Sequence, residues 1–295
     1  MTELEQLKTL LANIETLISQ YKTSITTPKP VIEEDLSTNI NNWFTTNLVS
    51  NKDKTLISGY VHPYKWTRNV NCWASNLDFT GTSVGIWGLG GVGGGTLITR
   101  KHVLLANHVP YPTAPFTVFF ANKNNNYYEY KVTRTKRVGT TDILIGELDK
   151  ETDPSLKVYN VLPANFTKYF TPQPISNQPR FPIIYSDQEK KVLIGDYIST
   201  FNNTSTEKVI HITSPNETTR SAYYEQVVVG DSGNPIYTII NNDLVLMGGW
   251  YMSLPTGGLG SSIPSYISDI NSIIASFSVG YKLNEASLVG FKTYN

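Results

Sequence analysis

The sequence predicts an all-β fold for most of the chain, with a helix near its C-terminal end. Three observations lead to this prediction. Short runs rich in β-branched and aromatic residues follow one another after Thr82. Clusters of turn-forming residues, such as Asn122–Asn126 and Asn241–Asp243, separate these runs. The only later helical pattern is Pro264 to Ala275, where a proline suits the first turn and isoleucines recur at helical spacing.

Each of the runs has the length and composition of one strand. No helical period interrupts them before residue 264, so the pattern favours an antiparallel barrel or sandwich. The runs are Gly95–Thr99, Val103–Ala106, Phe116–Ala121, Tyr127–Thr133, Ile143–Leu148, Phe181–Tyr185, Lys191–Thr200, Lys208–Thr213, Pro235–Ile240 and Leu244–Met247.

Residues 1–27 are predicted to form a coiled-coil helix. Thr2 and Glu5 fit a capping box at its start. Leu10 and Leu17 widen the apolar stripe, which favours three or more strands and a homo-oligomer. Two alternatives stay open: an amphipathic helix folded back on its own domain, and a removable propeptide. The heptad seam consists of Leu4, Leu7, Leu11, Ile14, Ile18, Tyr21 and Ile25.

Residues 28–83 are predicted to be a linker and a packing arm. The segment from Thr26 to Glu34 contains two prolines and should be extended. The following residues are rich in Asn, Thr and aromatics, with Trp43, Trp66 and Trp73 spread along them. We expect this arm to pack on the main domain without chemistry of its own.

Composition excludes several function classes. The 295 residues include 24 Lys and Arg against 24 Asp and Glu, so no excess of positive charge favours nucleic acid. The single cysteine, Cys72, excludes an intrachain disulfide and a cysteine-based metal site. No run approaches the roughly 18 apolar residues of a membrane helix, and no secretory signal pattern is seen. We therefore expect no nucleic-acid, membrane, metal or cofactor binding, and no export by a signal peptide.

The run Gly88 to Gly93 matches the dinucleotide-binding pattern G-x-G-x-x-G. That pattern works only where a strand leads through it into a helix, with an acidic residue about 20 positions further on. Here the glycines lead into the β-rich run Thr96–Thr99, and residues 108–118 contain no acid. We interpret the run as a flexible or close-packed backbone segment.

The strongest chemical signal is Gly230-Asp-Ser232-Gly-Asn-Pro235, which follows an apolar run. A serine hydroxyl needs a base to take its proton and donors to hold the oxyanion that forms. Flanking glycines let the backbone turn tightly, so the amides of Gly230 and Ser232 are candidate donors. The sequence therefore predicts a nucleophilic serine.

The base is expected to be a histidine, and all four histidines precede Ser232, which excludes the α/β-hydrolase order. His108 ends an apolar run, and Asp142 begins another. These residues give the order His, Asp, Ser. His62, His102 and His211 are interpreted as surface or strand residues without a catalytic role.

At these positions the chain resembles the chymotrypsin/trypsin-like serine peptidases, over roughly residues 84–278. The resemblance rests on Gly94–Ile98, Leu105–His108, Asp142–Ile145 and Gly230–Pro235. It implies two antiparallel six-stranded barrels over residues 84–280, with a C-terminal helix and a tail at 281–295. The pattern is closer to viral and bacterial members, because no disulfide cysteine follows His108.

The resemblance also implies roles. Ser232 would be the nucleophile, His108 the general base and then acid, and Asp142 the residue that orients the imidazole. The amides of Gly230 and Ser232 would form the oxyanion hole. No internal sequence offers a freed amine to Asp231, so activation by N-terminal insertion is not expected.

Four further residues are predicted to bind substrate. By the spacing of the family it resembles, counted back from Ser232, Gln226 would lie near the floor of the primary pocket, where an acid would select basic side chains. Gly249, Trp250 and Tyr251 resemble the segment that pairs with the substrate backbone as an added strand. Tyr251 would narrow the pocket, so we expect no preference for Lys or Arg at the cleavage site.

Two functions remain open at this point. The first is a serine endopeptidase that cleaves polypeptides as a homo-oligomer held by residues 1–27. The second is a structural or assembly protein that keeps the peptidase fold. The composition, rich in Asn, Thr and Ile and low in charge, suggests a phage or other viral particle protein. Its partners would then be other virion proteins, and its location the virus particle or the host cytoplasm.

Overall fold

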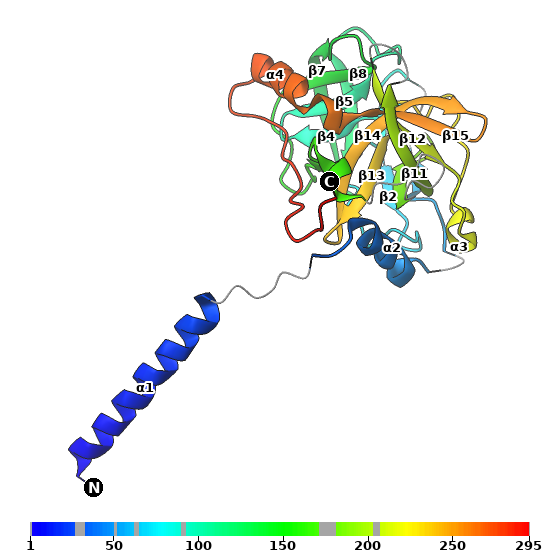
Figure 1. Cartoon of the computed structure of the whole chain (residues 1–295). Helices are drawn as coiled ribbons and strands as arrows, with labels where there is room; N and C mark the ends of the chain where they lie inside the picture. Colours follow the sequence, from blue (N-terminus) through cyan, green and yellow to red (C-terminus); the bar gives the residue numbers. More distant parts are fainter. Residues whose placement is uncertain are drawn as a thin grey trace. The chain divides into compact units, whose positions relative to one another are not determined.

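The structure is a computed structural model that describes residues 2–26, 33–49, 52–61, 65–89, 93–170, 181–202 and 207–294 (Figure 1). The chain divides into two compact units, Met1–Glu34 and Asp35–Asn295. The predicted extended linker with Pro28 and Pro30 falls largely outside the described residues. None of the helices within the described ranges is long and apolar enough to cross a membrane.

The first unit contains helix α1 (Glu3–Thr26). Its capping box forms as predicted: the Thr2 amide donates to Glu5 Oε2 at 2.8 Å, and the Glu5 amide donates to Thr2 Oγ1 at 3.4 Å. The apolar side chains described on this helix are exposed in the single chain: Leu4, Leu7, Leu10, Leu11, Ile14, Leu17 and Ile18. The helix is therefore present, and its assembly into a coiled coil stays a prediction.

The second unit begins with helix α2 (Leu36–Asn47), which the sequence did not predict. Asp35 caps it by accepting the Thr38 amide at 2.7 Å. The helix packs against strands β10 and β13, and Figure 1 shows it next to β13. Trp73 also enters the core, where its indole Nε1 donates to the Val192 carbonyl at 2.8 Å. The segment also includes a two-stranded hairpin of β1 (Ile57–Val61) and β2 (Lys65–Arg68).

A six-stranded antiparallel sheet forms a half-barrel in the order β3, β6, β7, β8, β5, β4. The resemblance implied a closed barrel here, which is wrong. Strand β3 has only two residues, and a single bridge from Thr82 to Thr96 spans the gap to β4. The bounds are β3 Gly85–Ile86, β4 Thr96–Thr99, β5 His102–Ala106, β6 Phe116–Ala121, β7 Tyr127–Arg137 and β8 Ile143–Leu148.

The other sheet closes into a six-stranded barrel because β13 pairs with both β10 and β14. Strand β9 (Asn160–Val161) adds to β14 in parallel as a seventh strand of the sheet. The barrel strands are β10 Phe181–Ser186, β11 Val192–Asn202, β12 Lys208–Thr213, β13 Pro235–Ile240, β14 Asp243–Leu254 and β15 Gly257–Ser262.

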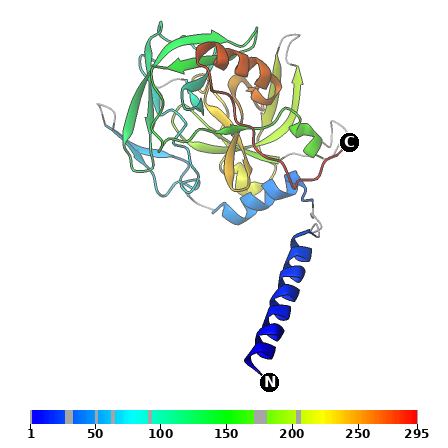
Figure 2. The same ribbon diagram turned by 90° about the vertical axis from the view of Figure 1, so that its left-hand side faces the viewer.

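The predicted terminal helix is present as the 3-10 turn η3 (Ile263–Tyr266) followed by α4 (Ile267–Phe277). Helix α4 packs against β8 of the half-barrel (Figure 2). The last residues return to the domain: Leu283, Leu288 and Phe291 are buried, and the Tyr294 hydroxyl donates to Asp35 Oδ2 at 2.7 Å. Two further short helices are η1 (Phe166–Tyr169) and α3 (Thr218–Ser221).

Candidate active site

Strand pairing brings the predicted histidine and aspartate together. His108 follows the end of β5, and Asp142 immediately precedes β8. The two strands are antiparallel, with Ala106 opposite Ile143, so the end of one lies beside the start of the other. The Asn107 amide donates to the Asp142 carbonyl at 2.7 Å and extends this pairing. Residues far apart in the chain therefore meet at one edge of the half-barrel.

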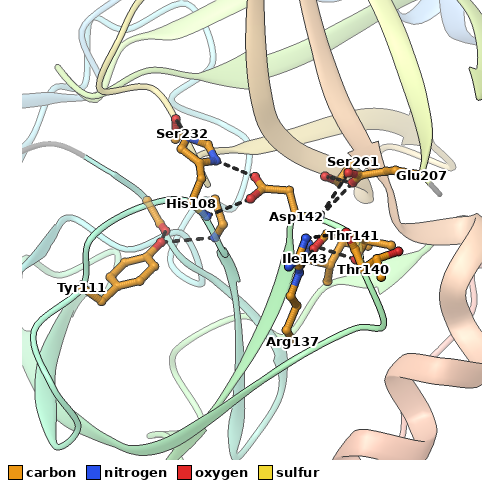
Figure 3. Close-up of polar contacts among 12 residues, drawn as sticks. His108, Tyr111, Arg137, Thr140, Thr141, Asp142, Ile143, Glu207, Ser232 and Ser261 are labelled. Carbon is orange, nitrogen blue, oxygen red and sulfur yellow. Dashed lines mark hydrogen bonds and ion pairs between the residues drawn. The ribbon is translucent and has the colours of Figure 1, made fainter. Parts of the chain in front are cut away.

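His108 connects the aspartate to the serine (Figure 3). Its Nδ1 lies 2.7 Å from Asp142 Oδ2, and its backbone amide donates to Asp142 Oδ1 at 2.8 Å. Its Nε2 lies 2.7 Å from Ser232 Oγ. The Asp142 side chain is 5% exposed and that of His108 is 45% exposed. The imidazole therefore has one buried anchor and one face open toward solvent.

The environment keeps the imidazole basic. The hydrogen bond to Asp142 raises the pKa of His108 above its ordinary value of 6.5, and partial burial opposes this rise. The charges of Asp142 and Glu207 raise this pKa further. A neutral imidazole whose Nδ1–H faces the carboxylate presents Nε2 as an acceptor to the serine.

Glu207 is a site residue that the sequence did not reveal. It lies directly before β12 and is 6% exposed. Both of its carboxylate oxygens lie 3.1 Å from the Asp142 amide nitrogen, and Ser261 Oγ donates to it at 2.7 Å (Figure 3). Burial raises the pKa of this carboxyl. Glu207 thus supports the segment that carries Asp142, and a lone acid before a strand gives no local signal of that role.

The loop that carries Ser232 takes a conformation that requires its glycines. Gly230 and Gly233 have φ of 109° and 77°, in the left-handed region. The glycine run at Gly93 and Gly94 packs against this loop: their amides donate to the carbonyls of Gly230 at 2.7 Å and Ser232 at 2.9 Å. A Cβ on Gly94 would lie only 2.6 Å from Asn234 Oδ1. The described part of the run is therefore close-packed.

The same run does not begin a helix. Residues 93–95 lead into strand β4, whereas a dinucleotide site requires a helix at that point. Residues 90–92 lie outside the described residues.

The amides of Gly230 and Ser232 donate no hydrogen bond to any described residue. Within the described part of the chain, both amides next to the serine oxygen are therefore unused. An oxyanion hole requires amides that are free to donate. The role of these two amides as an oxyanion hole remains a prediction.

Two of the predicted substrate-binding residues, Gly249 and Trp250, have backbones that pair within the protein. The Trp250 amide donates to the Asn234 carbonyl at 3.0 Å, and the Trp250 carbonyl accepts from Gly233 at 2.9 Å. Gly249 pairs with strands on both sides. The backbone of Trp250 is thus engaged within the protein, and the neighbouring Gly249 lies between two strands, so neither residue presents a free strand edge.

The two aromatic side chains of this segment lie in different surroundings. The Trp250 side chain is 1% exposed and packs edge-to-face on Tyr185, with ring centroids 5.0 Å apart. Tyr251 lies at a bulge in the pairing of β14 with β15, and its ring centroid is 6.2 Å from that of His108. Tyr251 is therefore the aromatic residue of this segment that borders the site.

Gln226 links two backbone segments. Its Nε2 donates to the carbonyls of Leu254 at 2.7 Å and Gly257 at 2.6 Å, and its Oε1 accepts from the Tyr224 hydroxyl at 3.0 Å. The Gln226 side chain thus connects the segment before the serine loop with the β14–β15 hairpin. This side chain carries a neutral amide and no charge.

The other histidines lie elsewhere or outside the described residues. His102 is fully buried, with Nδ1 2.8 Å from Thr99 Oγ1 and its ring stacked on Phe277. His211 lies within β12, and His62 is outside the described residues. Among the residues that the structure describes, no group of three or more His, Cys, Asp or Glu side chains could hold a metal ion.

No family model matches this chain, and no curated protein matches it in sequence.

Proposed function

We propose that this protein is a serine endopeptidase of the chymotrypsin-like kind. The observation that carries the proposal is the continuous chain of hydrogen bonds from Asp142 through His108 to Ser232, with both side-chain contacts at 2.7 Å. A half-barrel, then a barrel and then a terminal helix along the chain support it. The agreement of fold, chain order and geometry makes these residues a catalytic triad in this proposal.

The reaction follows from the positions of these groups. His108 Nε2 accepts the proton of Ser232 Oγ while that oxygen attacks the carbonyl carbon of a peptide bond. The amides of Gly230 and Ser232 would hold the oxyanion of the tetrahedral intermediate. His108 then gives its proton to the leaving amine, which leaves an acyl group on the serine. A water molecule, deprotonated by the same imidazole, hydrolyses this ester and regenerates the serine.

The proposed substrate is a polypeptide without a basic residue at the cleavage site. Gln226 supplies no negative charge to attract Lys or Arg, and the neighbouring Trp250 and Val227 are buried. A Cβ on Gly258 would lie 2.7 Å from Trp250 Cζ3 and 3.1 Å from Val227 Cγ2, so these two buried side chains pack closely on the backbone at Gly258. Virion proteins are the natural candidates if the chain belongs to a viral particle.

Labelling with a serine-reactive fluorophosphonate tests the proposal. We expect the full-length protein to be labelled, Ser232→Ala to remain unlabelled, and Ser272→Ala to be labelled like the parent. Ser272 is an exposed helix serine that serves as the matched control. Equal absence of label in the parent and Ser232→Ala would favour the structural or assembly function instead.

A further inference from the structure

A buried lysine lies beside the loop that carries Ser232. Lys190 is 8% exposed and belongs to the turn between β10 and β11. Its Nζ donates to Asn234 Oδ1 at 3.1 Å. A buried ammonium is costly unless opposite charges or hydrogen bonds compensate for the water it has lost. The proposed reaction does not use Lys190, so its place under the loop needs a separate explanation.

Two buried carboxylates compensate this charge. Asp187 and Asp231 are 7% and 2% exposed, and both favour the charged form of Lys190 electrostatically. Asp187 belongs to the same turn, where its Oδ1 accepts the Lys191 amide at 2.9 Å. Asp231 immediately precedes the serine. One carboxylate from its own turn and one from the serine loop thus favour the charged form of Lys190.

The same groups fix the backbone of the serine loop. Asp231 accepts the amides of Val228 at 2.8 Å and Gln188 at 3.0 Å through its two carboxylate oxygens. Asn234 is fully buried, and its Nδ2 donates to the Asp231 carbonyl at 3.0 Å. Contacts from the lysine turn therefore reach the loop on both sides of Ser232.

We propose that Lys190 is a positioning residue whose ammonium holds the loop 228–234 in the conformation that presents Ser232 and the Gly230 amide to substrate. This inference rests on the proposed peptidase function. Without the cation, the buried carboxylates of Asp187 and Asp231 would lose the positive charge of Lys190, and Asn234 Oδ1 would lose its donor. The loop would then relax toward solvent, and the serine would leave its contact with His108.

The ionisation of Lys190 makes the labelling rate depend on pH. A purely structural role of the side chain would not give this pH dependence. Burial lowers the pKa of Lys190 to about 8, against the opposing effect of Asp187 and Asp231. The other charged groups around the turn are Glu189, which acts on Asp231, and Lys191, which acts on Asp187. Raising the pH through about 8 removes the ammonium, so the proposed positioning fails on the alkaline side.

The experiment measures the rate of fluorophosphonate labelling of the full chain between pH 6 and 10. We expect the parent rate to fall as the pH rises through about 8. Lys190→Met should be slower by about 10²-fold at pH 7.5, the order of effect of losing an oxyanion donor, and should show no alkaline fall of its own. Lys190→Arg, which keeps its charge at every pH tested, should retain labelling above pH 9. Lys208→Met, at an exposed position, is the matched control.

The outcomes separate the two proposals. A parent protein that is never labelled overturns both the peptidase and the role of Lys190. A labelled parent whose rate stays flat from pH 8 to 10, or a Lys190→Met variant labelled at the parent rate, overturns the role of Lys190 alone. If circular dichroism shows that the Lys190 variants do not fold, the parent and Lys208→Met still test the proposal. The labelling rates of both should fall as the pH rises through about 8, and rates that stay flat would overturn the role of Lys190.

Discussion

Replacing Asp142 by asparagine isolates the contribution of its charge to the candidate site. The carboxamide has the shape of the carboxylate but carries no charge 2.7 Å from His108 Nδ1. Its NH₂ group can also face the imidazole and favour the tautomer protonated on Nε2. In that tautomer the imidazole cannot accept the proton of Ser232. Asp142→Asn should therefore disable the base while leaving the strand pairing around it intact.

The magnitude follows from the distance and the exposure. Two unit charges 2.7 Å apart interact by roughly 6 kcal/mol at an effective dielectric constant of about 20. Solvent reduces this value, because the His108 side chain is 45% exposed. A remaining loss of about 5 kcal/mol corresponds to a rate reduction between roughly 10³-fold and 10⁴-fold. The wrong tautomer in a serine peptidase triad gives a loss of about 10⁴-fold, which is of similar size.

The assay is the rate of fluorophosphonate labelling as a function of pH, compared with Asp149→Asn as a matched control. Asp149 is an exposed acid whose side chain accepts the Lys131 amide. The parent rate should rise with pH through a midpoint above 6.5, because the base must be neutral and the pKa of His108 is raised. In Asp142→Asn this midpoint should move to lower pH. A variant labelled within tenfold of the parent, with an unchanged unfolding temperature, would refute the reasoning.

Three further predictions concern the surrounding structure. Glu207→Gln should shift the acid-side midpoint of the labelling rate to lower pH, because the charge of Glu207 raises the pKa of His108; an unchanged midpoint would contradict this. Deleting residues 1–27 should reduce the mass measured by light scattering to that of a monomer, and an unchanged mass would remove the oligomer prediction. Ile40→Ala should lower the free energy of unfolding in urea by about 2–5 kcal/mol, whereas the exposed Thr45→Ala should change it by less than about 0.5 kcal/mol.

The main strands and the contacts of the candidate triad were predictable because local signals carried them. The runs at Val103–Ala106 and Ile143–Leu148 correspond to β5 and β8. Polar residues at the ends of such apolar runs come together once the two strands pair. The glycines around Ser232 marked a loop with unusual backbone angles. Short-range patterns are thus sufficient to predict the positions of His108, Asp142 and Ser232.

Features that depend on distant contacts were not predictable in this way. Helix α2 is rich in Asn and Thr, which are poor helix formers, so its local propensity does not indicate a helix. The burial of Ile40, Trp43 and Phe44 against the barrel stabilises it instead. Glu207 likewise gains its place only because its side chain, next to β12, reaches the Asp142 amide across the domain.

The register of β14 depends on a local feature that the sequence pattern does not predict. Successive side chains of a strand point to opposite faces, so a shift of one residue exchanges the residue in the core with the residue at the surface. In this strand a bulge at Tyr251 sets the register, and Trp250 is buried against Tyr185. Tyr251 therefore borders His108, and the described edge of β14 beyond it, Met252–Leu254, has β15 as its only strand partner. A substrate backbone that added to β14 would pair beyond Trp250, so the residues that set specificity are expected at and after Tyr251.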